Sequence, residues 1–385
     1  MSEAIVGTKQ AAEILGVSIS TIYRMVEQGI LEPTKTPGGQ RRFPVNQLEE
    51  YKEKSRSIIA PQNPYQMKSE TDASGIETHF DVSVADTEHE DDSPTTESAD
   101  DKPVDPRNPL NDLNGSQWLP ETKSFFYQKG LGAKHPHAQI ERQHPAPYSF
   151  QDITHLVTFF TKKGMAVLDP FGGVGSTAKA CELEGRICTS IELQERWHEL
   201  AIERLETEIG KGASQKHVFI NGDTREELKK LPDCSFDFMV TSPPYWSILN
   251  KKADHKVKKE RLANNLATNY SDNDENDLAN IESYEEFLQV LIDDVFLECG
   301  RLLRPKKYMC LVVSDFRNKS EFISFHSDII QALNRRITAD GYKITLQGVK
   351  VLLQNHKTLL PYGYPFAYVE NIHHQYILIF RKEKK

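Results

Sequence analysis

One stretch of the sequence, residues 165–185, limits the choice of fold more than any other. The apolar run Met165 to Leu168 predicts a strand that ends in Asp169, and a turn with three glycines follows before a helical stretch that ends at Gly185. Glycines let the backbone approach a ligand closely, and the start of a helix favours a carboxylate or a phosphate. This order of strand, glycine turn and helix is typical of an α/β fold that binds a nucleoside-containing cofactor.

Two further strands continue this pattern. The predicted strand Arg186 to Ile191 leads into Glu192, about 20 residues after the glycine turn, where an acid accepts hydrogen bonds from ribose hydroxyls. The predicted strand His217 to Ile220 leads towards Asp223. Both acids would therefore lie at the same edge of the sheet as the glycine turn.

From about residue 117 onward, short β-rich runs alternate with helical patterns, which indicates a mostly parallel α/β sheet. The later elements of the pattern are helices at 283–301 and 323–338, a strand at 308–313, and strands near Val349 and Tyr376. We therefore expect seven strands in all.

The strand predicted for Ser235 to Val240 leads into a stiff loop, Thr241-Ser242-Pro243-Pro244-Tyr245-Trp246. Two consecutive prolines stop the hydrogen-bond ladder of a strand and leave carbonyl groups without local N–H donors. In α/β enzymes, loops at the carboxyl ends of strands carry the chemistry. We therefore take Ser242, Pro243, Pro244 and Tyr245 as the candidate catalytic residues.

The S-P-P-Y loop at 242–245 resembles that of DNA amino-methyltransferases, and this resemblance implies methylation of an exocyclic amino group on a nucleic-acid base. Such a nitrogen is a poor nucleophile, because its lone pair is conjugated with the ring. Two acceptors that bind its two hydrogens expose the lone pair, and the Ser242 hydroxyl and the Pro243 carbonyl can be those acceptors. Tyr245 can stack on the base, which must leave the duplex to reach the pocket. The transfer depends on positioning and electrostatics, and it requires no covalent intermediate and no metal.

Together, D-P-F-x-G-x-G at 169–175 and S-P-P-Y at 242–245 resemble the S-P-P-Y type of S-adenosylmethionine-dependent DNA amino-methyltransferase. The resemblance covers about residues 117–385 and implies a Rossmann-like methyltransferase fold. It also implies that the first acid and the glycines hold the methionine part of S-adenosyl-L-methionine, the second acid the ribose, and the third acid the adenine amino group. The segment 143–150 resembles the family's H-P-A-P-F element, and it precedes the cofactor turn and the catalytic loop, a permuted order. The cofactor residues implied in this way are His144, Pro145, Asp169, Phe171, Gly173, Gly175, Thr177, Glu192 and Asp223.

These motifs leave the methylated base open. Serine at the first catalytic position resembles N4-cytosine enzymes more than N6-adenine enzymes, which usually carry Asp or Asn there, but S-P-P-Y also occurs in some adenine enzymes. The sequence has no Pro-Cys dipeptide, which argues against a cysteine-dependent carbon-5 cytosine methyltransferase. We therefore favour N4-cytosine over N6-adenine. An RNA methyltransferase and a DNA-binding regulator with an inactive methyltransferase fold are further alternatives.

The first 56 residues predict a small separate unit. Two predicted helices, at 8–15 and 19–28, have helix-turn-helix spacing. The stretch T-P-G-G-Q-R-R-F at 36–43 predicts a tight glycine turn with two arginines on its return arm. Residues 6–52 thereby resemble the MerR or excisionase type of winged helix-turn-helix. That resemblance implies DNA contacts by Ser20, Thr21, Tyr23, Arg24, Lys35, Arg41 and Arg42.

The chain has a net charge of −9, but the charge is unevenly spread. Glu70 to Asp105 holds 13 acidic residues and one lysine, a net of −12, so the other residues sum to +3. Residues 57–116 combine this like charge with few large apolar side chains and predict a disordered linker. We therefore expect three parts, a DNA-binding unit at 1–56, the linker at 57–116 and a methyltransferase domain at 117–385.

A basic stretch directly follows the catalytic loop. Lys251 to Arg261 contains six Lys or Arg residues and two acids. Beside a site that extrudes a base, such a loop would follow the phosphate backbone, whereas the plainer interpretation is a solvated insertion. The candidate phosphate contacts are Lys251, Lys252, Lys256, Lys258 and Lys259.

Double-stranded DNA is the partner that these features predict, and a cognate restriction or defence system is a further candidate. The sequence contains no run of about 18 uncharged apolar residues, so we expect no membrane span. The five cysteines form no C-x-x-C pair, which favours a reducing cytoplasm over a disulfide or zinc scaffold. Histidine pairs such as His373-His374 are too isolated to predict a metal site.

Overall fold

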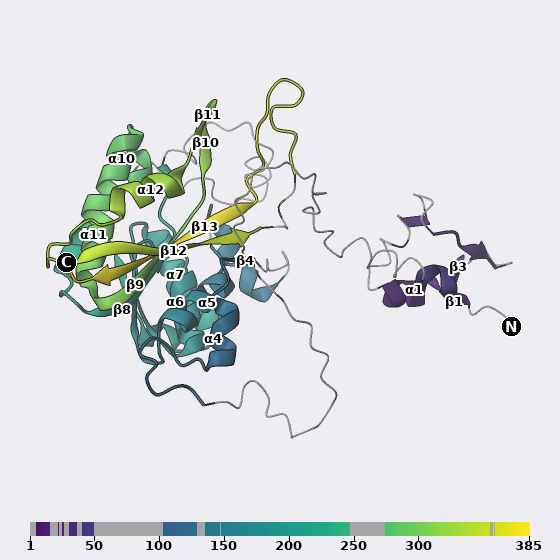
Figure 1. The fold of residues 1–385 in the computed structure, drawn as a ribbon, viewed down its shortest axis with the longest axis horizontal. Helices are drawn as coiled ribbons and strands as arrows, with labels where there is room; N and C mark the ends of the chain where they lie inside the picture. The colour runs from purple at the N-terminus through teal and green to yellow at the C-terminus, as the bar shows by residue number, and fades with distance from the viewer. Residues whose placement is uncertain are drawn as a thin grey trace, which may run out of the picture. The chain divides into compact units, whose positions relative to one another are not determined.

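The computed structural model describes residues 5–15, 22, 25–26, 31–36, 41–49, 103–128, 135–146, 148–246, 274–354, 357 and 359–385. They belong to two compact units, Met1–Glu90 and Asp91–Lys385. The second unit contains the predicted cofactor and catalytic residues, and its helices and strands are labelled in Figure 1.

The N-terminal unit combines a short helix with a three-stranded antiparallel sheet in the order β1-β3-β2. Its elements are β1 (Ile5–Gly7), α1 (Thr8–Leu15), β2 (Thr34–Lys35) and β3 (Arg41–Pro44). β2 and β3 are the two antiparallel strands on either side of the predicted glycine turn, and both arginines lie on β3, as predicted. The buried core consists of Ala11, Ala12, Ile22, Met25, Leu31, Phe43 and Leu48.

The second unit is built on an eight-stranded sheet in the order β4-β12-β13-β9-β8-β5-β6-β7. Within this sheet, every neighbouring pair is parallel except the two pairs that contain β13. This confirms the predicted α/β class with a mostly parallel sheet. The strands are β4 (Phe125–Tyr127), β5 (Ala166–Asp169), β6 (Ile187–Glu192), β7 (Val218–Asn221), β8 (Phe236–Thr241), β9 (Leu303–Val313), β12 (Lys343–Leu353) and β13 (His374–Glu383).

The predicted count of seven strands is wrong by one. The additional strand is β4, which is three residues long and pairs in parallel with the end of β12. A segment this short has no hydrophobic periodicity of its own, so its pairing depends on the exposed edge that β12 offers. A separate hairpin, β10 (Phe316–Asn318) with β11 (Glu321–Ile323), follows β9.

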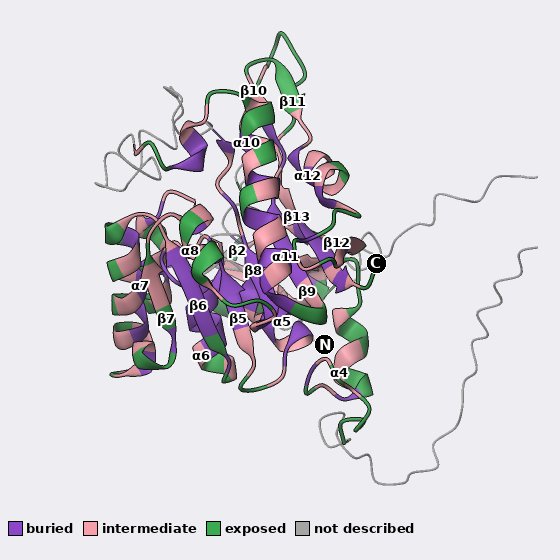
Figure 2. Cartoon of the chain, turned by 90° about the vertical axis from the view of Figure 1, so that its left-hand side faces the viewer, coloured by how far each residue is buried: buried purple, intermediate pink, exposed green. Residues whose placement is uncertain are grey.

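Helices cover both faces of the sheet. One face packs against α5 (Phe150–Phe160), α6 (Ser176–Glu184) and α7 (Glu195–Glu208). The other packs against α8 (Thr224–Lys230), α10 (Tyr284–Val290), the π-helical turn η6 (Leu291–Phe296), α11 (Leu297–Leu302) and α12 (Phe325–Leu333). Successive strand side chains point to opposite faces, so Val167 joins one core and its neighbour Leu168 joins the other. Figure 2 shows the strands as the buried layer between helices with exposed outer faces.

Two predicted helices differ in detail from the observed ones. The helix expected at 283–301 is continuous but contains the π-helical turn η6. The helix expected at 323–338 ends at Leu333, and Arg335 adopts a positive φ of 68°. Among the described residues, no helix is long and apolar enough to cross a membrane. All five cysteines are free thiols.

Residues 103–116, which the sequence assigns to the linker, belong to the described residues, and several of them are anchored to the folded unit. Asn111 is fully buried, and its side-chain amide donates a hydrogen bond of 2.6 Å to the Phe159 carbonyl. Asn114 caps α4 (Gly115–Glu121) in a reciprocal pair with Gln117. These anchoring contacts are made by asparagine side chains, so a prediction based on apolar residues misses them.

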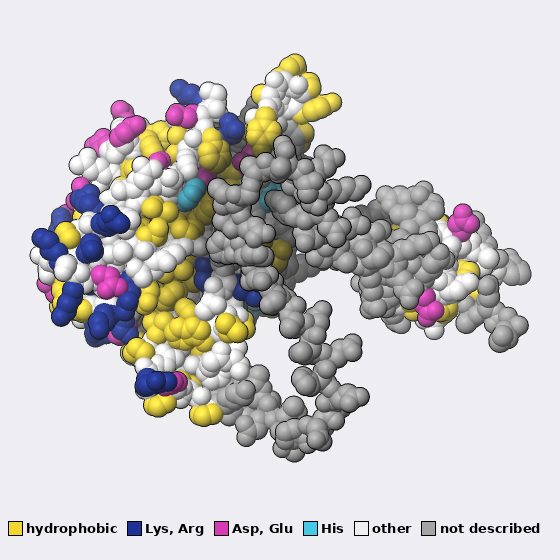
Figure 3. Space-filling view, viewed as in Figure 1, with side chains coloured by type: hydrophobic (Ala, Val, Ile, Leu, Met, Phe, Trp, Pro, Cys, Tyr) yellow, Lys and Arg dark blue, Asp and Glu magenta, His cyan; other side chains and the backbone are white. Residues whose placement is uncertain are grey.

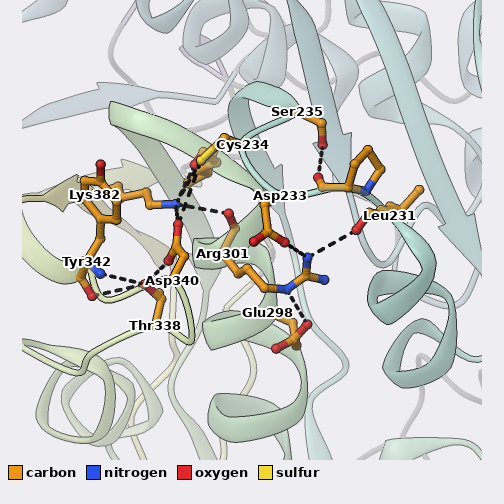
Figure 4. A network of polar contacts seen from close by, with 12 residues as sticks. Leu231, Asp233, Cys234, Ser235, Glu298, Arg301, Thr338, Asp340, Tyr342 and Lys382 are labelled. Atoms are coloured by element: carbon orange, nitrogen blue, oxygen red, sulfur yellow. Dashed lines mark hydrogen bonds and ion pairs between the residues drawn. The ribbon is translucent and has the colours of Figure 1, made fainter.

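A network of buried polar groups holds the sheet at the edge opposite the glycine turn (Figure 4). The fully buried Lys382 ammonium pairs with Asp340 and donates to the Leu303 and Arg301 carbonyls at 2.7 and 3.0 Å. The Arg301 guanidinium donates in turn to the Leu228 carbonyl at 2.9 Å. A buried ammonium is tolerated only when it is paired and hydrogen-bonded. The network therefore fixes β13 against the start of β9 and leaves the opposite edge for the site.

Candidate active site

A cavity opens at the carboxyl ends of β5, β6, β7 and β8, where the sequence places its motifs. Its empty volume is about 860 Å³ with the open mouth included. The predicted residues on its wall are His144, Phe171, Gly173, Glu192, Asp223, Ser242, Pro243 and Pro244. The structure thus brings the predicted cofactor turn and the predicted catalytic loop onto one cavity.

Asp169 is not on the wall of the cavity but is fully buried beneath it. Its Oδ1 accepts hydrogen bonds from Thr241 Oγ1 at 2.6 Å and from the Phe171 backbone amide at 3.1 Å. Its Oδ2 accepts from Tyr148 and Thr177, both at 2.5 Å. Burial raises the pKa of Asp169, and these four donors act in the opposite direction. This carboxyl group thus joins the end of β8 to the glycine turn.

The glycine turn is shaped by contacts that leave no room for side chains. A Cβ on Gly172 would lie 1.9 Å from Ser190 Oγ. Gly175 has a φ of +74°, and a Cβ there would lie 2.9 Å from the Cβ of Ala201 on α7. The glycines therefore allow close approach of backbone to β6 and of α6 to α7. Gly175 serves this packing and is not on the cavity wall.

Glu192 stands on the cavity wall at the end of β6. Its two carboxyl oxygens accept hydrogen bonds from backbone amides, Oε2 from Gly173 at 2.8 Å and Oε1 from Gln194 at 2.9 Å. Burial raises the pKa of Glu192 to about 7, although the two amide donors lower it. Each carboxylate oxygen has a further lone pair, so Glu192 can accept hydroxyl donors from a ligand.

Asp223 also lines the cavity and caps α8 through the Arg225 backbone amide at 2.9 Å. The Arg225 guanidinium holds the same carboxylate, with Nη2 donating to Oδ2 at 2.6 Å and Nε contacting both oxygens at 3.0 Å. This guanidinium fixes the orientation of Asp223. The sequence prediction named the acid but missed its partner two residues later.

The catalytic loop places Ser242, Pro243 and Pro244 on the cavity wall. Its position is fixed on one side by the bond from Thr241 to Asp169 and on the other by Trp246, whose indole Nε1 donates to the Ile281 carbonyl at 2.8 Å. Trp246 is buried and adopts a positive φ of 24°. The loop is therefore anchored on both sides of the three residues that face the cavity.

Tyr245 is not among the residues that line the cavity. Its ring packs edge-on against Phe325 with the centroids 6.2 Å apart, and its phenol oxygen accepts a hydrogen bond of 3.1 Å from Gln375. Burial raises the pKa of Tyr245, and hydrogen bonds from Ser242 and Gln375 lower it. These contacts hold Tyr245 in place beside the loop, and its stacking on a base stays a prediction.

Behind the cavity, two fully buried cations hold the segment 135–148 against α6 and α7. Lys179 pairs with Glu208 at 2.5 Å and contacts His137 at 2.8 Å, and burial lowers the pKa of this lysine. Arg204 pairs with Glu141 at 2.6 Å and also contacts Glu208 at 3.1 Å. The wall residue His144, which packs edge-on against Trp197, is positioned by this segment. Pro145 and Thr177 lie nearby but do not line the cavity.

The described wall of the cavity carries an acidic character. Glu192, Asp223 and Asp277 line it, and none of the wall residues that the structure describes is a lysine or an arginine. Low-dielectric walls of one sign concentrate ligands of the opposite sign. The described wall thus presents carboxylates to a ligand, of which Asp223 is paired with the Arg225 guanidinium.

Several wall residues were missed by sequence reasoning. Trp197 projects from α7, while Asn276, Asp277 and Leu278 belong to a segment about 30 residues after the catalytic loop. Their part in the cavity depends on the path of the chain between β8 and α10, and no local pattern signals it. Tyr148 belongs to the segment 143–150 that resembles the H-P-A-P-F element, but only the structure shows its hydrogen bond to Asp169.

Many of the predicted nucleic-acid contacts lie outside the described residues. This applies to Ser20, Thr21, Tyr23 and Arg24 in the N-terminal unit and to Lys251, Lys252, Lys256, Lys258 and Lys259 after the catalytic loop. Nothing is described of the Lys35 side chain. Arg41 and Arg42 are placed on β3 and are half-buried.

One comparison with known proteins bears on the N-terminal unit. A family model described as a helix-turn-helix domain matches residues 5–56, which confirms the predicted helix-turn-helix. YubD of Escherichia coli (strain K12), a protein provisionally named as a methylase, is 39% identical to this chain over 64 residues. The matched segment covers 17% of this chain and 28% of YubD.

The chain is also similar to solved structures, with low TM-scores. A Clostridium thermocellum protein provisionally described as an rRNA-methylase shares 12% identity over 62% of this chain and 98% of its own, with a TM-score of 0.36. A Thermus thermophilus protein provisionally described as a DNA modification methylase shares 24% identity over 43% of this chain and 53% of its own, with a TM-score of 0.26.

We predict that Gly175→Ala destabilises the second unit by roughly 3 kcal/mol, because it adds both backbone strain and overpacking against Ala201. Gly164→Ala is the matched control, since Gly164 has a similar φ of +78° but open space around it. This control should lose only roughly 1 kcal/mol of unfolding free energy. Urea unfolding of the full chain measures both values. Equal losses would show that the approach of α6 to α7 does not require glycine.

Proposed function

We propose that the chain is an S-adenosyl-L-methionine-dependent DNA methyltransferase that modifies the exocyclic amino group of a base, with cytosine N4 favoured over adenine N6. One observation carries this proposal. A cavity lined by Glu192, Asp223 and Asp277 and the Ser242-Pro243-Pro244 loop share one wall at the carboxyl ends of the strands in a mostly parallel sheet.

The residues of the cavity fit S-adenosyl-L-methionine. The group carries a net positive charge from its sulfonium, amine and carboxylate, and the described wall bears three acids without a lysine or an arginine. Glu192 would hold the ribose hydroxyls, and Gly172 and Gly173 leave the backbone open to the methionine part. Leu278 and Ile191 offer apolar contact to the adenine ring. When bound, the group supplies an electrophilic methyl on its sulfonium.

The chain's own contribution to the reaction is to orient the amino group of the base and to expose the lone pair of its nitrogen. Ser242 and the Pro243 carbonyl accept the two amino hydrogens, so the nitrogen lone pair is no longer shared with the ring. The anchoring of the loop by Asp169 and Trp246 keeps these acceptors in place without reorganisation. The loop thus needs to supply only orientation and two fixed acceptors.

The choice of cytosine follows from Ser242. Its hydroxyl is neutral and accepts one amino hydrogen, whereas adenine enzymes usually carry a side-chain carboxylate or amide at this position. The amino chemistry itself is the same for both bases, so adenine N6 is the alternative. An RNA substrate fits less well, because a helix-turn-helix reads a wide major groove and A-form RNA has a narrow one.

The N-terminal unit is proposed to deliver the enzyme to duplex DNA. Its helix-turn-helix match and the two arginines on β3 support this role. Arg41 and Arg42 would contact phosphates, which position a protein without reading sequence. The part played by Lys251 and its neighbours, an association with a restriction or defence system, and the cytoplasmic location remain predictions from the sequence.

Replacing Ser242 tests the proposed chemistry. We expect Ser242→Ala to lower kcat for methyl transfer to DNA about 100-fold, as removal of one preorganised hydrogen-bonding group does. The affinity for S-adenosylhomocysteine should be nearly unchanged, because the serine acts on the base. Ser235→Ala, directly before β8 and at the opposite end of this strand from Ser242, is the control and should leave kcat intact. Loss of S-adenosylhomocysteine binding together with kcat would contradict the assigned role.

The pH dependence of cofactor binding tests Glu192. Burial raises the pKa of this carboxyl to about 7, and hydroxyl donors bind its ionised form more tightly. The affinity for S-adenosylhomocysteine should therefore rise as pH increases, by about tenfold between pH 6 and pH 8, with proton release on binding. Isothermal titration calorimetry in two buffers measures both quantities. Glu192→Gln should bind weakly at every pH, and the exposed control Glu195→Gln should keep the slope. An unchanged slope in Glu192→Gln would refute this assignment.

A further inference from the structure

Between β12 and β13 the chain leaves the sheet as a long loop (Figure 1). Residues 359–369, here called the aromatic loop, contain four aromatic residues and no charged residue. Tyr364, Phe366 and Tyr368 are 81%, 94% and 82% exposed. Figure 3 shows hydrophobic side chains along this projecting loop. A group of exposed aromatic rings of this kind marks a contact surface.

The backbone of the aromatic loop is held in a defined turn. The Gly363 carbonyl accepts hydrogen bonds from the Phe366 and Ala367 amides at 2.7 and 2.8 Å. Gly363 has a φ of +73°, and a Cβ there would lie 2.3 Å from the Ala367 carbonyl oxygen. At the base, the Asn371 side chain bonds both the amide and the carbonyl of Leu360, each at 2.9 Å. The rings are therefore presented by a preorganised support.

The base of the loop lies at the catalytic edge of the sheet. Strand β12 runs in the same direction as β8, so both end at the edge that carries the cavity. The Gln354 amide, directly after β12, donates to the His373 carbonyl at 2.8 Å and closes the stem. Gln375, near the start of β13, donates to the Tyr245 phenol at 3.1 Å. The Ser242 loop is thus hydrogen-bonded to β13, the strand that follows the aromatic loop.

We infer that the aromatic loop is a DNA wedge, which inserts the Phe366 ring into the base stack beside the extruded base. This inference rests on the proposed function, since a base that leaves the duplex opens an apolar gap between two base faces. Aromatic rings stack on any base, and apolar wedges stabilise opened steps. The absence of charge within 359–369 suits the base stack better than the phosphate backbone. The site of base removal and the loop lie at the same sheet edge, which favours DNA over a protein partner.

Duplex opening provides the test. The full chain is titrated with a fluorescent 30-base-pair duplex and with the same duplex carrying one abasic site, which leaves a gap ready for the ring. The wild type should bind the abasic duplex about tenfold more tightly, as expected for one stacked ring. Phe366→Ala should bind both duplexes equally, and Phe366→Trp should keep the preference. Phe322→Ala, at an aromatic residue on β11 that is 40% exposed, is the control and should keep it too.

A second measurement separates this inference from the proposed function. Phe366→Ala should lower kcat/KM for methyl transfer to duplex DNA about tenfold and leave transfer to single-stranded DNA unchanged, because a single strand needs no opening. Absence of any transfer by the wild type would refute the proposed function, while the abasic preference would still decide the wedge. An abasic preference retained by Phe366→Ala would overturn the wedge. The wedge would also be overturned if Phe366→Ala bound DNA as tightly as the wild type but sedimented as a monomer where the wild type is a dimer. That result would make the aromatic loop a contact between two copies of the chain.

Discussion

The arrangement of the candidate site depends on one buried carboxyl group, that of Asp169. Its two oxygens accept four hydrogen bonds, from Thr241 on β8, from Thr177 on α6, and from Tyr148 and the Phe171 amide on either side of β5. A buried carboxyl without such donors is strongly unfavourable, so the donors and the acid require one another. This mutual requirement sets the distance between the glycine turn and the catalytic loop.

Charged side chains are arranged differently behind the cavity and on its wall. Behind it, Lys179 and Arg204 are buried with Glu141 and Glu208 as partners, so they stabilise the wall without offering charge to a ligand. In front, three acids face the cavity and no described wall residue is a lysine or an arginine. A glycine turn alone would suit a dinucleotide as well. In the proposed function, the carboxylates of Glu192 and Asp277 suit a cofactor with a net positive charge, and the Ser242 loop suits an amino group that receives its methyl.

Site residues could be predicted from the sequence where their role depends only on neighbouring residues in the chain. Glycines at a strand-to-helix turn, acids after strands and two prolines after a buried strand each follow from local backbone needs, and the structure collects most of them around one cavity. The sequence could not predict features that depend on distant partners. Strand β4 exists only through the edge of β12, and Asn276 to Leu278 reach the cavity from beyond the predicted catalytic loop. Tyr245 contacts Gln375 and Phe325, which lie far away in the sequence. The anchoring of residues within 103–116 is hidden because asparagine side chains provide it.

The identity of the modified atom tests the central claim most directly. The full chain is incubated with unmodified DNA and S-adenosylmethionine that carries a deuterated methyl group, and the DNA is digested to nucleosides for mass spectrometry. The account predicts the label in N4-methyldeoxycytidine. Label only in N6-methyldeoxyadenosine would reject cytosine and retain amino transfer through Ser242 and Pro243. Label at carbon 5 of cytosine, or no label in DNA, would contradict the account.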